Sequence, residues 1–155
     1  MKKILLVALS LFLVASCSKK SDLKDDSADR TSLGYGIGGS DAGLAGDLRT
    51  INFDYDQFSL TAVTKNTLMA NAEWLKVNPA ITIQVEGHCD GRGTIEYNIA
   101  LGERRAAAVK AYLVGLGIEK SRVSTVSYGK ERPLVNEETE YAWAQNRRAN
   151  FVVIN

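Results

Sequence analysis

The chain has 155 residues, 45% of them hydrophobic and 24% charged, and its 19 Lys and Arg against 18 Asp and Glu leave a net charge of +1. This length fits one domain of ~100–200 residues with a tail, and a charge so near zero excludes the clearly basic surface typical of nucleic-acid-binding domains. Two cysteines exclude a disulfide-rich scaffold, and a single histidine excludes a multi-histidine metal site.

The first residues have the pattern of a secretory signal. Lys2 and Lys3 form a short positive head, and residues 4–15 form a nearly unbroken apolar run. This run is shorter than the ~20 residues that a membrane-spanning helix needs. It ends in Val14-Ala15-Ser16-Cys17, which resembles a bacterial lipobox. The resemblance implies that residues 1–16 are removed, that Cys17 carries a lipid anchor, and that the following Ser18 favours the outer membrane.

Residues 17–47 are expected to form the lipidated cysteine and a flexible tether. The segment is rich in Ser, Lys, Asp and Gly, and its large apolar residues are sparse. Such a composition buries too little surface to offset the entropy lost on ordering. We therefore expect the folded domain to run from Leu48 to Asn155.

Apolar periodicity in residues 48–155 alternates between strand and helix patterns. Residues 81–86 alternate apolar and polar side chains, which predicts a strand with one buried face. Residues 61–77 repeat apolar positions at helical spacing and stop at Asn78-Pro79. The whole pattern predicts strands over 50–53, 81–86, 122–128 and 149–154, and helices over 61–77, 96–116 and 137–146. This order predicts an α/β fold, an α+β sandwich in which a small mixed βαβαββ sheet carries helices on one face.

Two opposite charges could form a binding site beyond the strand at 81–86. Asp90 lies in a loop with three glycines, and Arg105 lies on the following helix on the same face as Asn98 and Leu101. One interpretation is that Asp90 takes an ammonium group and Arg105 holds a carboxylate, so that together they bind a zwitterion. The alternative is that Asp90 and Arg105 simply pair with each other.

Several ordered motifs make the chain similar to a known family. These are Val85–Thr94, Glu96–Asn98, Leu101–Ala106, Val126–Pro133, Asn146–Ala149 and Phe53-Asp54. Together they resemble the peptidoglycan-associated lipoproteins, which have the OmpA-like C-terminal domain also found in flagellar stator proteins. The resemblance covers essentially all of residues 48–155, and the lipobox and tether complete it.

The resemblance implies non-covalent binding of the diaminopimelate in peptidoglycan stem peptides, with no enzymatic activity and no cofactor. It assigns the binding residues to Asp90, Arg105, Asn98, Leu101, Phe53, Asp54, Tyr55, Asp56 and Arg148. It also implies a role in the Tol–Pal system in envelope integrity and cell division, with a TolB-like β-propeller competing with the wall. The alternative is a related lipoprotein that acts outside that system as a wall anchor or protein adaptor.

Cys89 departs from the family pattern, which usually has Thr or Ala there. After lipidation of Cys17 it is an odd thiol, most simply a small buried residue, with oxidation or an intermolecular bridge as alternatives. A Cys89–His88 enzyme or a metal site including Asp90 is disfavoured, because neighbouring residues of an extended chain point to opposite sides. His88 is expected to brace the loop by hydrogen bonds, and Trp143 to pack in the core or at its edge.

Overall fold

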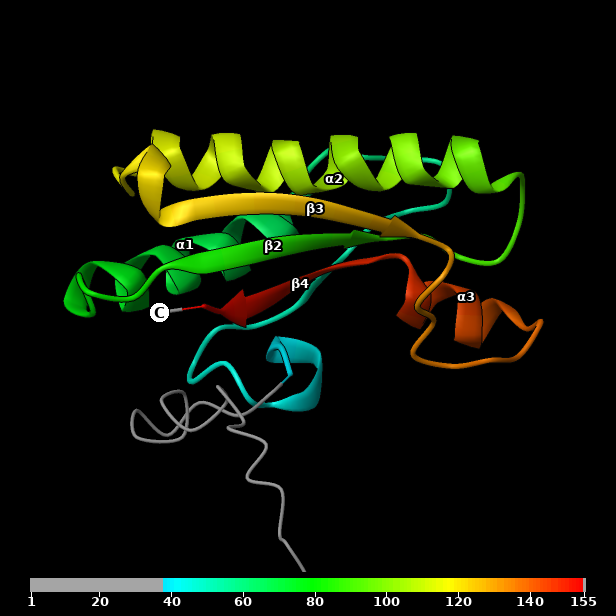
Figure 1. Cartoon of the computed structure of the whole chain (residues 1–155), viewed down its shortest axis with the longest axis horizontal. Helices are drawn as coiled ribbons and strands as arrows, with labels where there is room; N and C mark the ends of the chain where they lie inside the picture. The colour runs from blue at the N-terminus through cyan, green and yellow to red at the C-terminus, as the bar shows by residue number, and fades with distance from the viewer. Residues whose placement is uncertain (1–37, 155) are drawn as a thin grey trace, which may run out of the picture.

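The computed structural model describes residues 38–154 (Figure 1). The predicted signal, the lipidation site Cys17 and most of the predicted tether lie outside the described residues. The strands are β1 (Ile51–Asn52), β2 (Ile83–His88), β3 (Val123–Gly129) and β4 (Arg148–Val153), and the helices are α1 (Ala62–Val77), α2 (Ile95–Gly115) and α3 (Glu140–Asn146).

The four strands form one mixed sheet in the order β1-β4-β2-β3. β2 and β3 run parallel and are joined through α2, whereas β4 pairs antiparallel with both β1 and β2. The last strand of the chain is therefore a central strand of the sheet. The predicted α/β class and the mixed sheet are confirmed, and the short helix α3 lies between the last two strands of the predicted βαβαββ order.

Helix starts are determined by threonine side chains. Thr61, Thr94 and Thr139 each precede a helix, and each hydroxyl accepts a hydrogen bond from the backbone N–H three residues later. The cap at Thr139 explains why α3 begins at Glu140 and not at the predicted residue 137. At its other end α2 is followed by Gly117, whose φ of +95° suits glycine.

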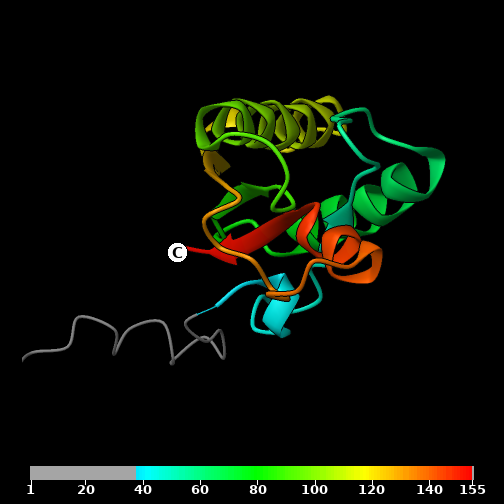
Figure 2. The same cartoon turned by 90° about the vertical axis from the view of Figure 1, so that its right-hand side faces the viewer.

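The core lies between the sheet and the two long helices, which cover one face (Figures 1 and 2). Alternate residues of the central strands, such as Val85 and Phe151, point into it and are completely buried. From the helices, Leu68 of α1 and Val109 of α2 meet them. Burial of each such side chain stabilises the fold by ~1.5–3 kcal/mol.

A glycine pair brings α2 close to β2. A Cβ built on Gly87 would overlap the backbone carbonyl of Gly102, and a Cβ on Gly102 would overlap the hydroxyl of Ser127. Side chains at either position would push the helix away from the sheet. This close approach positions the N-terminal half of α2, which carries Asn98, Leu101 and Arg105, over the end of β2.

The expectation that the flexible segment extends to Asp47 is wrong for residues 38–47. This segment contains the 3-10 turn η3 (Ser40–Ala42) and packs against β4 on the side of the sheet away from α2 (Figure 2). Ala45 is fully buried, and the Asp41 carboxylate lies 3.0 Å from Nε of Arg148. Ser40 Oγ donates to Asn150. These polar contacts hold a segment whose apolar content alone does not predict order.

No helix between residues 38 and 154 is long and apolar enough to cross a membrane.

Candidate functional site

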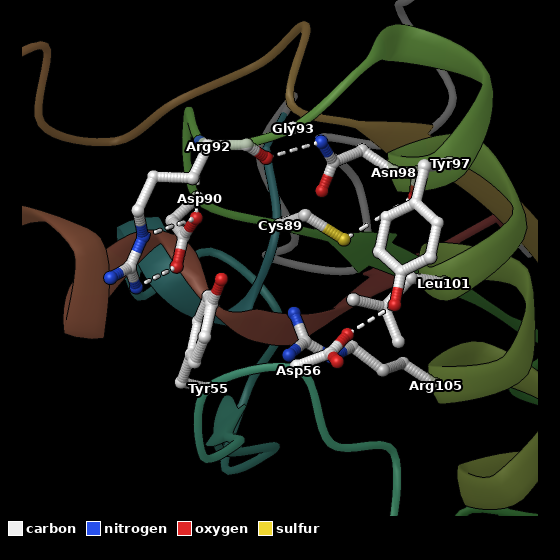
Figure 3. A pocket seen from close by; sticks show the side chains of 10 residues that line it. All are labelled: Tyr55, Asp56, Cys89, Asp90, Arg92, Gly93, Tyr97, Asn98, Leu101 and Arg105. Atoms are coloured by element: carbon white, nitrogen blue, oxygen red, sulfur yellow. Dashed lines mark hydrogen bonds and ion pairs between the residues drawn. The ribbon is translucent and has the colours of Figure 1, made fainter.

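A pocket of about 170 Å³ opens where the loop after β2 meets the first turns of α2 (Figure 3). Six of the predicted binding residues line it: Tyr55, Asp56, Asp90, Asn98, Leu101 and Arg105. They come from three parts of the chain, namely the loop after β1, the loop after β2 and α2. The fold therefore brings together most of the residues that the motifs indicated.

Asp90 is the buried acid of the pocket. Its carboxylate accepts two side-chain hydrogen bonds from Arg92, Nη2 at 2.6 Å and Nε at 3.2 Å, and one from the backbone N–H of Arg92. Arg147 adds a further bond at 3.3 Å. Burial opposes ionisation of the Asp90 carboxyl, but the hydrogen bonds and charge of Arg92 outweigh it and lower the pKa of Asp90. Asp90 is therefore an anion at neutral pH.

Arg105 is the buried base of the pocket and forms part of its lining. Its guanidinium donates to three backbone carbonyls: Nε to Gln57 at 2.8 Å, Nη1 to His88 at 2.8 Å and Nη2 to Asp54 at 3.1 Å. A guanidinium has five N–H groups, so two remain beyond these bonds. Although burial lowers the pKa of Arg105, an arginine remains charged at neutral pH.

The two charges of the pocket have different partners. Asp90 is bound to Arg92 and Arg147, whereas Arg105 is held by main-chain oxygens. The alternative in which Asp90 and Arg105 simply pair with each other is therefore wrong. One small cavity offers a carboxylate and a guanidinium, which is the arrangement that a zwitterion requires.

Asn98 and Lys130 hold the loop that carries Asp90. Asn98 Nδ2 donates to the carbonyls of Arg92 at 2.7 Å and Thr94 at 2.9 Å. Lys130, which follows β3, donates to Gly93 at 2.6 Å. Asn98 thus has a clear structural role at this site, namely fixing the turn that aims Asp90 into the pocket.

Tyr55, Asp56 and Tyr97 form the mouth of the pocket. Asp56 has a φ of +56°, a left-handed conformation that aspartate tolerates better than most residues. Its carboxylate accepts a hydrogen bond from the hydroxyl of Tyr97, which ties the loop after β1 to α2. The rings of Tyr55 and Tyr97 are half exposed at this opening. Sequence reasoning missed Tyr97, because adjacent residues of a helix face different directions and its partner Asp56 lies on a distant loop.

Phe53 and Asp54 support the pocket from outside it. The Phe53 ring is buried, and the Arg105 guanidinium lies over it at 4.9 Å from the ring centre. Asp54 contributes its backbone carbonyl to Arg105 and borders a different cavity. Both residues position Arg105 and do not line the pocket themselves.

The expectation that Arg148 faces this pocket is wrong. Arg148 begins β4 and its Nε donates to Asp41, on the sheet face that η3 covers. The preceding Arg147 reaches Asp90 instead, and also donates to Phe53 at 3.1 Å and Glu140 at 2.9 Å. Sequence reasoning chose the wrong member of the pair because adjacent side chains at the start of a strand point to opposite faces.

Cys89 and His88 do not form a nucleophile and base. Burial raises the pKa of the Cys89 thiol to about 11, and its Sγ donates to the backbone carbonyl of Asn98 at 3.3 Å. A catalytic thiol needs the opposite, a lowered pKa. Cys89 is a small buried wall of the pocket.

His88 braces the site differently from the expectation. Its side chain is buried, and its Nε2 lies 3.5 Å from the Glu86 carboxylate, beyond ordinary hydrogen-bond length. Neither ring nitrogen has a hydrogen-bond partner within the part of the chain that the structure describes. The ring packs beside Tyr128, with 5.6 Å between centroids, while the backbone carbonyl of His88 holds Arg105. His88 therefore supports the site through its backbone carbonyl and not through side-chain hydrogen bonds.

Residues 38–154 contain no group of three or more His, Cys, Asp or Glu side chains placed to hold a metal ion. The chemistry available at the pocket is charge recognition.

Comparison with known proteins agrees with this geometry. The model of the OmpA family matches residues 52–147. The chain is 43% identical to the peptidoglycan-associated lipoprotein of Haemophilus influenzae, over 95% of this chain and 94% of that protein. It is 41% identical to the protein of the same name from Brucella melitensis, over 95% and 90% of the two chains.

A solved structure shows the same likeness. The crystal structure of the peptidoglycan-associated lipoprotein from Burkholderia pseudomallei superimposes with a TM-score of 0.66 at 42% identity, covering 68% of this chain and 89% of that one. The chain belongs to the OmpA family and, within it, to the peptidoglycan-associated lipoproteins. Members of this family are binding proteins and not enzymes.

Proposed function

We propose that this protein binds peptidoglycan non-covalently by gripping the zwitterionic end of diaminopimelate in stem peptides. Asp90 takes the ammonium group, and Arg105 takes the carboxylate with the N–H groups that its main-chain bonds leave over. Each charge-assisted hydrogen bond contributes ~1.5–3 kcal/mol when it is shielded from water. No covalent bond is made or broken, so binding is reversible.

The observation that carries this proposal is the placement of Asp90 and Arg105 in one pocket with different partners. A carboxylate and a guanidinium that neutralised each other would have little left for a ligand. Here main-chain oxygens hold Arg105 rigidly, and the Asn98 turn aims Asp90 at the same cavity. A cavity of about 170 Å³ suits the end of one amino acid rather than a whole sugar.

A sedimentation assay with isolated peptidoglycan tests the proposal. Asp90→Asn keeps the shape of the side chain and removes its charge, and we expect it to weaken co-sedimentation by about tenfold or more. Free meso-diaminopimelate should compete with the wall for the wild-type protein. A matched control is Arg104→Gln, which removes a charge from α2 beside Phe58 at a residue that does not line the pocket. Unchanged sedimentation of Asp90→Asn would refute the proposal.

The position of the protein in the envelope is part of the same proposal. The lipobox ending at Cys17 and the names of the relatives support a lipoprotein, and Ser18 favours anchoring in the outer membrane with the domain in the periplasm. The protein would then tether the outer membrane to the cell wall. Labelling with a palmitate analogue tests it, because Cys17→Ser should abolish both labelling and membrane retention.

A role in the Tol–Pal system extends this proposal to envelope integrity and cell division. It rests on the similarity to the peptidoglycan-associated lipoproteins. The expected partners are other Tol proteins and a TolB-like β-propeller that competes with the wall for this domain. Co-purification of a β-propeller that peptidoglycan fragments displace would support the role. A protein that binds peptidoglycan but captures no such partner would instead be a wall anchor or adaptor outside the system.

A further inference from the structure

Asp90 already has a side-chain cation bound to it, on the side of the pocket where a ligand's ammonium would lie. Arg92 grips both carboxylate oxygens, with Nη2 at 2.6 Å from Oδ2 and Nε at 3.2 Å from Oδ1 (Figure 3). Arg147 also reaches Oδ2, at 3.3 Å. The backbone N–H of Arg92 makes a fourth bond, to Oδ1. A carboxylate has only about four lone-pair positions, so a ligand's ammonium cannot be added without loss of one of these bonds.

Of the two arginines, Arg92 is the one that can leave. Arg147 is 9% exposed and is held further by the carbonyl of Phe53 and the carboxylate of Glu140. Arg92 is 32% exposed, and its side-chain hydrogen bonds are the two to Asp90. Its backbone is fixed independently, since the N–H donates to Asp90 and the carbonyl accepts from Asn98. The side chain can therefore move while the loop stays in place.

The Arg92 guanidinium has a path away from Asp90. While bound to Asp90 it lies between two aromatic rings, 4.0 Å from the centre of Tyr55 and 4.1 Å from that of Trp143. Nη1 lies 3.9 Å from the Glu140 carboxylate. Arg92 also forms the wall between the binding pocket and a neighbouring cavity of about 390 Å³ that Trp143 lines. A short movement along the two rings takes the guanidinium away from Asp90 and towards Glu140.

We propose that Arg92 is an internal cation that occupies the ammonium position at Asp90 in the free protein and is displaced by the ligand. This inference rests on the proposed function and names the residue that sets its specificity. A ligand with an ammonium alone gains Asp90 but must displace two charge-assisted bonds, so the exchange gives little net binding. A zwitterion gains Arg105 as well, and this second contact drives the exchange. Arg92 therefore restricts the site to ligands that carry both charges.

The variant Arg92→Gln tests this displacement. The proposal predicts that the variant binds the ligand more tightly, whereas loss of a ligand contact would weaken binding. Removal of the internal competitor should tighten binding of meso-diaminopimelate by about tenfold, the equivalent of roughly one charge-assisted bond. Binding of pentylamine, which has an ammonium and no carboxylate, should rise by a similar factor and become measurable, because both ligands displace the same side chain. Calorimetric titrations of the full chain with both compounds measure these changes. Asp90→Asn should lose both ligands, and Arg104→Gln should match the wild type.

The outcomes separate this inference from the proposed function. If wild type binds diaminopimelate and Arg92→Gln binds it more weakly, Arg92 contacts the ligand and the inference is wrong while the function stands. If wild type does not bind diaminopimelate, both fall. A measurement on the wild type covers the case in which the variant fails to fold: the Nε–H resonance of Arg92 should shift on addition of diaminopimelate and stay unchanged with pentylamine at equal concentration. An unshifted resonance at saturation with diaminopimelate would overturn the exchange.

Discussion

Arg147 and Arg148 are consecutive in the chain, yet their guanidinium groups bind carboxylates in different parts of the molecule. Nη1 of Arg147 lies 3.3 Å from Asp90 at the binding pocket, and Nε of Arg148 lies 3.0 Å from Asp41 in the segment before β1. Arg147, just before β4, therefore supports Asp90, and Arg148, the first residue of β4, anchors the N-terminal segment. The two contacts are adjacent in sequence but lie in different parts of the molecule.

This separation predicts different effects for the two arginines. Arg148→Met leaves the Asp41 carboxylate buried without its cation, which should lower the free energy of unfolding by about 3 kcal/mol. Peptidoglycan sedimentation of the folded variant should match the wild type. Arg147→Met should weaken sedimentation, because it removes a support of Asp90. Urea unfolding and co-sedimentation measure the two effects.

A double variant provides the control for the ion pair. Asp41→Asn combined with Arg148→Met removes both charges and should recover part of the lost stability. Strictly additive losses would contradict a direct coupling between Asp41 and Arg148.

The approach of α2 to β2 predicts that Gly87 tolerates no side chain. Gly87→Ala places a methyl group on the Gly102 carbonyl, which is backbone and cannot rotate away. We expect a loss of about 3 kcal/mol or more in the free energy of unfolding. Gly91→Ala is the matched control four residues later, in the loop after β2, since a Cβ there meets nothing within 4 Å. Its effect should stay within about 0.5 kcal/mol, and equal losses for both variants would contradict the packing argument.

His88 predicts a dependence of stability on pH. Burial lowers the pKa of His88 below its ordinary value of 6.5, and the neighbouring Glu86 and Asp41 carboxylates only partly offset this and the repulsion of Arg148. The unfolded chain then binds more protons than the folded chain between the folded-state pKa and 6.5. The contribution of neutral His88 to stability is therefore complete above about pH 6.5 and declines as the pH falls towards the folded-state pKa.

Proton NMR can follow this residue without assignment, because it is the single histidine of the chain. The folded protein should titrate with a midpoint below 6.5. His88→Phe should flatten the fall in unfolding free energy between about pH 7 and 5. A midpoint at or above 6.5 would contradict the prediction.

Cys89 should be unreactive in the folded protein. With a pKa of about 11, only about one thiol in a thousand is ionised at pH 8. In a protein expressed without residues 1–17, Cys89 is the only cysteine. Ellman's reagent should label it at least about 100-fold more slowly in buffer than in guanidinium chloride. Labelling at the unfolded rate would show instead that the thiol is accessible and available for oxidation.

Local patterns in the sequence predicted most of the fold. Three of these patterns depend on neighbouring residues only: the alternation over residues 81–86, the helical spacing over 61–77 and the glycine loop after β2. Each helix and strand appears within a few residues of its expected bounds. The same reasoning failed for residues 38–47, because their order depends on Asn150 and Arg148, more than 100 positions further along the chain.

The binding site shows the same division. The charges Asp90 and Arg105, and their spacing on a loop and a helix face, could be chosen from the sequence because the motif and the helical period place them. The sequence could not predict the roles of Arg92, Arg147 and Tyr97. These roles depend on contacts with residues that are distant in the sequence or lie on other elements.

The length, the near-zero charge and the ordered motifs of this sequence by themselves determined one OmpA-like domain, and they indicated Asp90 and Arg105 as its candidate binding charges. Only the tertiary structure decided that these two charges have different partners, that Arg92 binds Asp90, and that Arg147 rather than Arg148 contacts Asp90. The physical reason is that the sequence lists the charges, whereas long-range packing determines which charges meet, and at these distances the pairing decides what remains free for a ligand.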